Sequence, residues 1–217
     1  MRLKYIIIVG IIFLACVSLA LIYVTGYQID LVNKDIKQTG IISVQTDNAN
    51  IYLDDKLVGN GRVTLRNITP NSYNIKVTKE GYHIWEKNIK LEAGEAEILN
   101  NIVLFKENII PREFSVDQND FFNKIADTAQ IRVDGGEIYQ NDQLVTRFDK
   151  NIYGASWYPN NQYIAFTYNA KLHIMEIDAT NDIEILDKDS QTPIVFVNSG
   201  KSVIYENNGK VYQADIR

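Results

Sequence analysis

The sequence predicts an all-β protein that carries one N-terminal transmembrane helix. Residues 5–24 contain no charged side chain, which is typical of a membrane-spanning helix. From Thr39 onward, short runs alternate between apolar and polar residues and are broken by Gly, Asn, Asp and Pro, which is the pattern of strands and turns. Beyond residue 114, a similar pattern recurs after 39 residues. We therefore expect a helix, a small β-sandwich and a region of repeated sheets.

Residues 5–25 form the predicted transmembrane helix. Thirteen of the twenty residues in 5–24 are Ile, Leu, Val or Phe. A helix of that length spans about 30 Å, which is the hydrocarbon thickness of a bilayer. The apolar side chains favour insertion by about 4–8 kcal/mol in total.

The charges around this helix predict its orientation. Arg2 and Lys4 lie in residues 1–4, which we expect to be cytoplasmic by the positive-inside rule. The chain would then be a single-pass protein of the cell membrane, with its C-terminal domains outside the cytoplasm. The formal net charge is −5, and it becomes −7 without those two cations. An acidic domain lacks the clustered basic face that nucleic acid requires, so we expect no nucleic-acid partner.

Two other uses of the N-terminal segment are weaker. A cleaved signal peptide has the same basic start, and Ser18-Leu19-Ala20 offers a cleavage site. Its apolar core is usually about 7–15 residues, however, and here the apolar run continues to Val24. Lipid attachment at Cys16 is disfavoured by the preceding Phe-Leu-Ala, so we expect this cysteine to face lipid. The chain after the helix has no cysteine and therefore no disulfide.

Residues 26–38 are predicted to be a short polar spacer, and residues 39–105 a small β-sandwich. A turn is expected at Asp54-Asp55 and another at residues 68–71. The residues that alternate on the predicted strands are Ile42, Val44, Thr46, Ile51, Leu53, Val63, Leu65, Tyr73, Ile75, Val77, Trp85, Ile89, Leu91, Ile98, Ile102 and Leu104. Six or seven strands in fewer than 70 residues fit a small sandwich.

The same region resembles the PEGA domain, a small β-sandwich of bacterial and archaeal surface proteins. The resemblance lies in residues 49–55 (ANIYLDD) and 68–82 (ITPNSYNIKVTKEGY), where a Pro-containing turn, an alternating strand and a Lys-x-Gly-Tyr ending have the family's spacing. Asn71-Ser72 replace the acidic residue and glycine of the family's turn, and Asn tolerates positive φ. The resemblance implies no catalytic residue.

Residues 114–217, after a predicted linker at 106–113, contain the repeat. A shift of 39 residues aligns Trp157 with Phe196, Ile164 with Val203 and Phe166 with Tyr205, among other pairs. Residues 131–139 form a looser third copy. A spacing near 40 is typical of a four-stranded propeller blade.

Residues 155–166 (ASWYPNNQYIAF) resemble the core motif of TolB-like, WD-type β-propeller blades. The resemblance implies an incomplete β-propeller-like region of about two and a half blades that binds partners without doing chemistry. Closed propellers have about 4–8 blades. The chain is thus a shortened form of a longer protein, an open stack of sheets, or one part of a ring completed by several chains. We favour the first.

The search for reactive groups predicts no catalytic, cofactor-binding or metal-binding residue. His83 and His173 are expected to be partly exposed strand residues, and no pair of residues has metal-ligand spacing. Asp178, Asp182 and residues 187–190 lack the glycine and closing glutamate of a calcium loop. Gly59-Asn60-Gly61 is expected to be a hairpin turn rather than a phosphate-binding loop.

The aromatic side chains leave the binding residues unknown. Trp85 and Trp157 are expected in the core, whereas Tyr153, Tyr158 and Tyr163 are expected near the surface beside a turn. Aromatic residues are enriched at recognition surfaces, but they also suit half-buried strands.

The preferred function is a non-catalytic, membrane-anchored binding or scaffold module of the cell envelope. Its expected partners are the membrane and an envelope protein or glycan, without a cofactor, and the oligomeric state is open. The alternative is the sensory or regulatory ectodomain of a larger signalling system. An envelope hydrolase is the weakest hypothesis.

Overall fold

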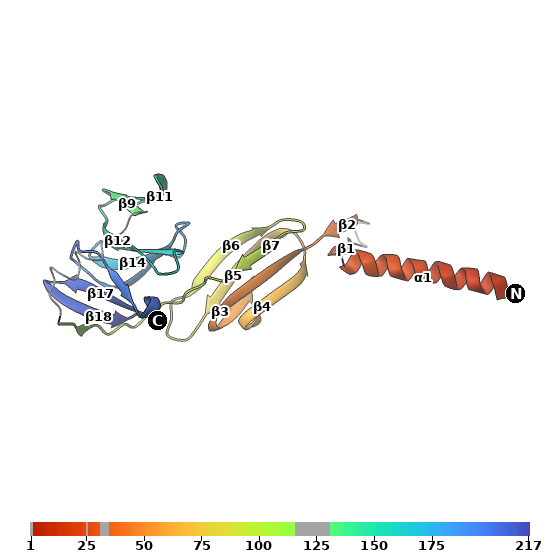
Figure 1. Cartoon of the computed structure of the whole chain (residues 1–217), viewed down its shortest axis with the longest axis horizontal. Coiled ribbons are helices and arrows are strands. Elements are labelled where there is room, and N and C mark those ends of the chain that lie inside the picture. The colour runs from red at the N-terminus through yellow and green to blue at the C-terminus, as the bar shows by residue number, and fades with distance from the viewer. Residues whose placement is uncertain (1, 25, 31–34, 116–130) are drawn as a thin grey trace. The chain divides into compact units, whose positions relative to one another are not determined.

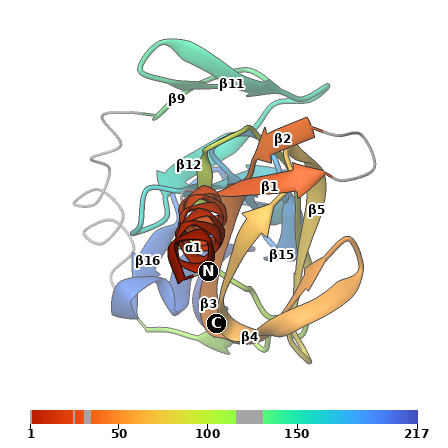
Figure 2. The same ribbon diagram turned by 90° about the vertical axis from the view of Figure 1, so that its right-hand side faces the viewer.

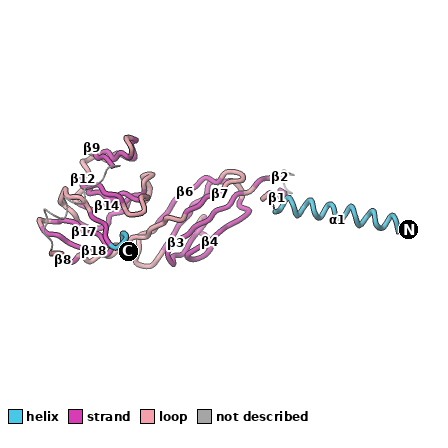
Figure 3. The backbone as a smooth tube through the Cα atoms, in the orientation of Figure 1, coloured by secondary structure: helices cyan, strands magenta, loops and turns pink. Residues whose placement is uncertain are grey.

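The structure is a computed structural model that describes residues 2–24, 26–30, 35–115 and 131–217 (Figure 1). The described part is mostly β-structure with one α-helix (Figure 3). The parts of the predictions that concern residues 1, 25, 31–34 and 116–130 lie outside the described residues. The chain divides into two compact units: Met1–Lys76 with Asn88–Asn100, and Val77–Lys87 with Asn101–Arg217.

The helix α1 (Arg2–Val24) exposes its apolar side chains between Tyr5 and Leu21 and at Val24. Ile6, Phe13 and Leu14 are each 66% exposed, and Cys16 is exposed as well. Ser18 Oγ donates a hydrogen bond to the Leu14 carbonyl one turn earlier, at 2.9 Å. Among the described residues, no helix combines the length and the apolarity needed to cross a membrane. The prediction of a transmembrane helix is therefore not confirmed.

The predicted spacer contains two short strands, β1 (Tyr27–Asp30) and β2 (Asp35–Gln38). They pair antiparallel, with Tyr27 opposite Gln38 (Figure 2). The Thr39 amide and hydroxyl both donate to the Gly26 carbonyl, at 2.7 and 2.6 Å. The segment is thus folded back on itself.

The next sheet has the strand order β4-β3-β5-β6, and β7 pairs parallel with β3. Its strands are β3 (Gly40–Leu53), β4 (Lys56–Ile68), β5 (Asn71–Thr78), β6 (Trp85–Leu91) and β7 (Ala96–Leu99). The predicted turn at Asp54-Asp55 is confirmed, and both residues have positive φ (47° and 62°), as a tight hairpin requires. The hairpin predicted at Gly59-Asn60-Gly61 is wrong, because these residues lie inside β4.

The first two strands predicted in this region are one strand, β3, with an irregularity. Its pairing with β4 shifts register between Gln45 and Asn50, where Asn48 has a φ of 46°. A shift of this kind bends a strand without ending it. The alternation is observed on either side, since Ile42, Val44 and Ile51 are at most 1% exposed.

The second unit contains three further antiparallel sheets. The first is β9 (Ile131–Asp134), β10 (Glu137–Gln140) and β11 (Gln143–Arg147). The second is β12 (Tyr153–Trp157), β13 (Tyr163–Tyr168), β14 (Lys171–Glu176) and β15 (Ile183–Asp187). The third is β16 (Val195–Val197), β17 (Ser202–Asn207), β18 (Lys210–Asp215) and β8 (Arg112–Glu113), with a short 3-10 turn at Asn198–Gly200.

The repeat predicted at 39 residues coincides with these strands. A shift by that number takes the bounds of β13 onto β17 and those of β14 onto β18. The aligned residues share their burial: Ile164 and Val203 are both 0% exposed, and Phe166 and Tyr205 are 0% and 2% exposed. The repetition of strands is therefore confirmed, whereas a propeller is not.

The apolar cores lie between successive sheets of this unit. Ile138, Ile164 and Phe166 belong to a cluster that joins the first and second sheets. Ala165, Tyr205 and Phe105 belong to a cluster that joins the second and third sheets. The second sheet is thus covered on both faces, as the uninterrupted burial of Tyr163–Thr167 shows.

Candidate functional site

The two histidines lie in separate environments. His173, expected to be partly exposed, is only 6% exposed: its ring stacks on Phe166 at 5.4 Å, and its Nδ1 lies 2.9 Å from Asp182 Oδ1. That expectation was wrong because β14 belongs to the sheet covered on both faces. The backbone amide of His83 donates to the Phe105 carbonyl at 2.8 Å. Neither arrangement places a histidine beside a nucleophile in the described part of the chain.

The acidic loops are held by protein donors. Asp178 accepts from Lys87 and Thr180, Asp187 pairs with Lys171, and the Asn208 amide donates to Asp189. Within the described ranges, no group of three or more His, Cys, Asp or Glu residues is arranged to hold a metal ion.

Lys188, from the same stretch, is fully buried between the second and third sheets. Its Nζ donates to the carbonyls of Ser190 and Thr192, at 2.6 and 2.9 Å, and to Ser190 Oγ at 3.0 Å. Burial lowers the pKa of this amine to about 8. Because the donors of the ammonium group are occupied, its role is to hold the connection from β15 to β16.

Two of the three tyrosines expected near the surface form a buried aromatic cluster instead. Tyr158 and Tyr163 are each 2% exposed, and both pack edge-to-face on Phe105 at 5.6 Å. The Val103 amide donates to the Tyr163 hydroxyl at 2.9 Å, and burial raises the pKa of that phenol. The expectation of exposure is therefore wrong for Tyr158 and Tyr163, whereas Tyr153 is half-buried.

A buried carboxylate, Glu176, joins the start of β6 to the second sheet. It accepts hydrogen bonds from Trp85 Nε1, from Lys87 Nζ at 2.6 Å and from Thr180 Oγ1 at 3.2 Å. Lys87 Nζ also lies 2.6 Å from Asp178. Burial disfavours the charged form of Lys87, but its hydrogen bonds to Asp178 and Glu176 outweigh burial and raise its pKa. Burial also disfavours the charged form of Asp178, but its hydrogen bonds from Lys87 and Thr180 outweigh burial and lower its pKa. The carboxylates of this cluster already accept hydrogen bonds from protein groups, so we assign the cluster a structural role.

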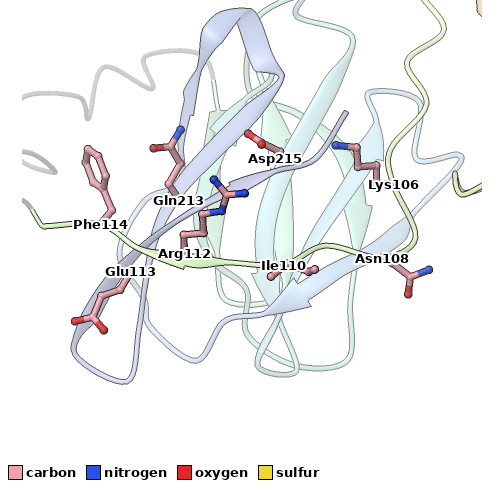
Figure 4. A pocket seen from close by; sticks show the side chains of 8 residues that line it. All are labelled: Lys106, Asn108, Ile110, Arg112, Glu113, Phe114, Gln213 and Asp215. Carbon is pink, nitrogen blue, oxygen red and sulfur yellow. The ribbon is translucent and has the colours of Figure 1, made fainter.

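A polar groove in the second unit is the strongest candidate for a binding site (Figure 4). It has a cavity volume of about 410 Å³ and lies where residues 106–114, which contain β8, run beside β18. This segment is fixed at two points: the Lys106 amide donates to the Ile216 carbonyl at 2.9 Å, and Arg112 and Glu113 pair with Gln213 and Tyr212.

Between those two points the segment leaves the strand and opens the groove. Pro111 lacks the amide hydrogen needed to continue the ladder, and Ile110 is 82% exposed on the rim. Asn108 and Phe114 complete the lining. The groove is therefore made by an interruption of strand pairing.

The groove contains two cations and two anions, and the anions have hydrogen-bond partners whereas the cations have none in the part of the chain that the structure describes. Glu113 accepts from Lys210 Nζ at 3.0 Å, and Asp215 accepts from Ser202 Oγ at 2.7 Å. The side chains of Lys106 and Arg112 have no hydrogen-bond or ion-pair partner among the described residues. In Figure 4 the heads of Arg112, Gln213 and Asp215 gather on one side of β18, the amino group of Lys106 points toward Asp215, and Glu113 points away.

These features define the class of the protein: a mostly β chain of small, mainly antiparallel sheets with a polar surface groove. Within it, residues 39–104 match the model of the PEGA domain family, which confirms the resemblance in that part. No curated protein matches the chain.

Proposed function

We propose that this protein is a non-catalytic binding or scaffold module of the cell envelope, anchored in a membrane by α1 and displaying its β-domains outside the cytoplasm. The PEGA-family match carries the proposal, because that family is a β-domain module of extracellular or periplasmic proteins. The anchor is supported by the uncharged run of residues 5–24 and by the exposure of the apolar side chains of α1.

The sheets of the second unit act in this proposal as propeller-like blades that present the groove. The support is the 39-residue repetition of β13 and β14 as β17 and β18, and the packing of each sheet on the next. Display near the envelope raises the effective concentration of the groove for neighbouring ligands, so even weak recognition suffices.

The test is fractionation of cells that express the full chain with a C-terminal tag, followed by protease treatment of the intact cells. The tag is expected in the membrane fraction, resistant to carbonate extraction and cleavable from outside. Replacing Ile8, Ile11 and Leu14 with Lys is expected to release the protein from the membrane.

The matched control replaces Leu57 and Ile98, which are exposed apolar residues of strands (55% and 62%), with Lys. This control variant should stay in the membrane fraction. Recovery of the intact, soluble wild-type chain in the cytosol would overturn the proposal. Crosslinking in the same cells that recovers only a membrane kinase or receptor would favour the regulatory ectodomain instead.

A further inference from the structure

We infer that the groove beside β18 binds a ligand through an anionic oxygen group, a carboxylate or a phosphate, held by Arg112 and Lys106. The inference rests on the proposed function as a binding module and names the chemistry of its ligand. It is drawn from three features of the groove: two cations that have no partner within the described ranges, the fixed backbone that carries them, and the polar groups beside them.

The first feature is the state of the cations. Elsewhere in the second unit, Lys87, Lys171 and Lys210 each form an ion pair shorter than 3.1 Å. The side chains of Lys106 and Arg112 form none among the described residues, although both line the same cavity. Glu113 and Asp215 balance these two cations in formal charge, but both carboxylates accept hydrogen bonds from residues outside the groove, which leaves Lys106 and Arg112 as the groups without a partner among the described residues that can attract an anion.

The second feature is how these residues are mounted. Arg112 belongs to β8 and pairs with Gln213 of β18, while the Lys106 amide is bonded to Ile216 at the other end of the groove. Both side chains thus start from backbone that is already fixed, which reduces the entropy lost on binding. The planar guanidinium suits two-point binding of a carboxylate or phosphate, and the lysine adds a point charge.

The third feature is the set of polar groups around the cations. The Gln213 amide offers donors and an acceptor beside Arg112. Asp215 keeps one oxygen on Ser202 and has a second that accepts a hydrogen bond. Its charge repels a bare anion, so the best ligand carries a hydroxyl or ammonium donor next to its anionic group.

The experiment is calorimetric titration of the full chain in detergent micelles with glucuronate and, separately, with glycerol phosphate. The two arms distinguish a carboxylate source from a phosphate source. We expect saturable binding of at least one probe, weakened by added salt. Arg112→Gln and Lys106→Gln are each expected to weaken binding about tenfold or more.

Two variants make the result specific. Lys150→Gln removes the same charge from an exposed residue outside the groove and is expected to leave binding unchanged. Asp215→Asn keeps an acceptor for Ser202 but removes the repulsion, and is expected to tighten binding by about two- to fivefold.

The inference is overturned if neither probe binds, or if Lys150→Gln weakens binding as much as Arg112→Gln. Either result leaves the proposed function standing when the same protein still fractionates with the membrane. If the chain binds the anion but is found in the cytosol, the inference about the groove is supported and the proposed envelope function is contradicted.

Discussion

At the scale of single residues, the most connected group of the second unit is the Glu176 carboxylate. It is 7% exposed and receives hydrogen bonds from an indole, an ammonium group and a hydroxyl. Removing one partner of such a cluster is costly because the others stay buried without a partner. The indole of Trp85 is therefore held to the second sheet by this side chain, whereas Lys87 is also held by its ion pair with Asp178.

Glu176→Ala is expected to lower the free energy of unfolding of the second unit by about 3–5 kcal/mol, because Lys87 loses a buried counter-charge and Trp85 Nε1 loses its acceptor. Glu176→Gln keeps an acceptor for the indole and is expected to cost less, about 1–2 kcal/mol. Guanidinium denaturation followed by tryptophan fluorescence measures both.

Glu184→Ala, at an exposed position of β15, is the control and is expected to stay within about 0.5 kcal/mol of the wild type. Equal losses from Glu176→Ala and Glu184→Ala would show that the cluster does not hold the unit together.

At the scale of elements, one tight turn and the spacing of the repeated strands were predictable from the sequence because they depend on neighbouring residues, whereas the hairpin predicted at residues 59–61 lies inside β4. The Asp54-Asp55 turn and the correspondence of β13-β14 with β17-β18 are examples. The exposure of Tyr158 and Tyr163 was not predictable in this way. An alternating pattern predicts burial correctly only when one face of a strand is exposed to solvent, and the sheet that contains β13 is packed on both faces.

The groove was beyond sequence analysis for a related reason. Its cations come from residues 106–112, whereas Gln213 and Asp215 come from β18, and the pairing of β8 with β18 and the bond of the Lys106 amide to Ile216 bring them together. A two-residue strand carries too little pattern to reveal its partner. The interruption by Pro111 was the one local signal.

The start of β12 gives a test at this scale. Gly154 has a φ of 57°, and a Cβ placed there would lie 2.4 Å from the Thr192 carbonyl oxygen. Gly209 has a φ of 71°, and a Cβ there would meet nothing within 4 Å. Gly154→Ala is expected to lower the free energy of unfolding by about 3 kcal/mol or more, and Gly209→Ala by about 1 kcal/mol.

Both substitutions carry the cost of a positive φ, so the difference between them measures the close approach of β12 to the connection before β16. Thermal or chemical denaturation of the two variants provides it. Equal destabilisation would mean that the connection yields easily at Thr192.

At the scale of the whole molecule, the unfolding equilibrium depends on pH through Lys188. The pKa of this amine is about 8 in the folded protein and 10.5 as its ordinary value. Between these values the unfolded chain binds a proton that the folded protein does not, so stability rises with pH. Below pH 8 both states are protonated, and the dependence disappears.

Through Lys188, the free energy of unfolding is therefore expected to increase by about 1–2 kcal/mol between pH 8 and pH 9.5. Lys188→Met removes the titrating group and is expected to flatten this rise. Urea denaturation of both proteins at several pH values measures the slope. Identical slopes would assign the effect to another group.

The pairing of β8 with β18 also determines when the third sheet can form during biosynthesis. Glu113 and Lys210, which form an ion pair, lie 97 residues apart in the sequence, so the third sheet cannot form completely until β18 has been translated. At about 5–20 residues per second, the ribosome needs about 5–20 s to supply it. During that interval β8 has been synthesised, but β18, the strand with which it pairs, has not. This region must therefore mature after its synthesis is complete, and a nascent chain stalled before residue 210 should remain sensitive to proteases.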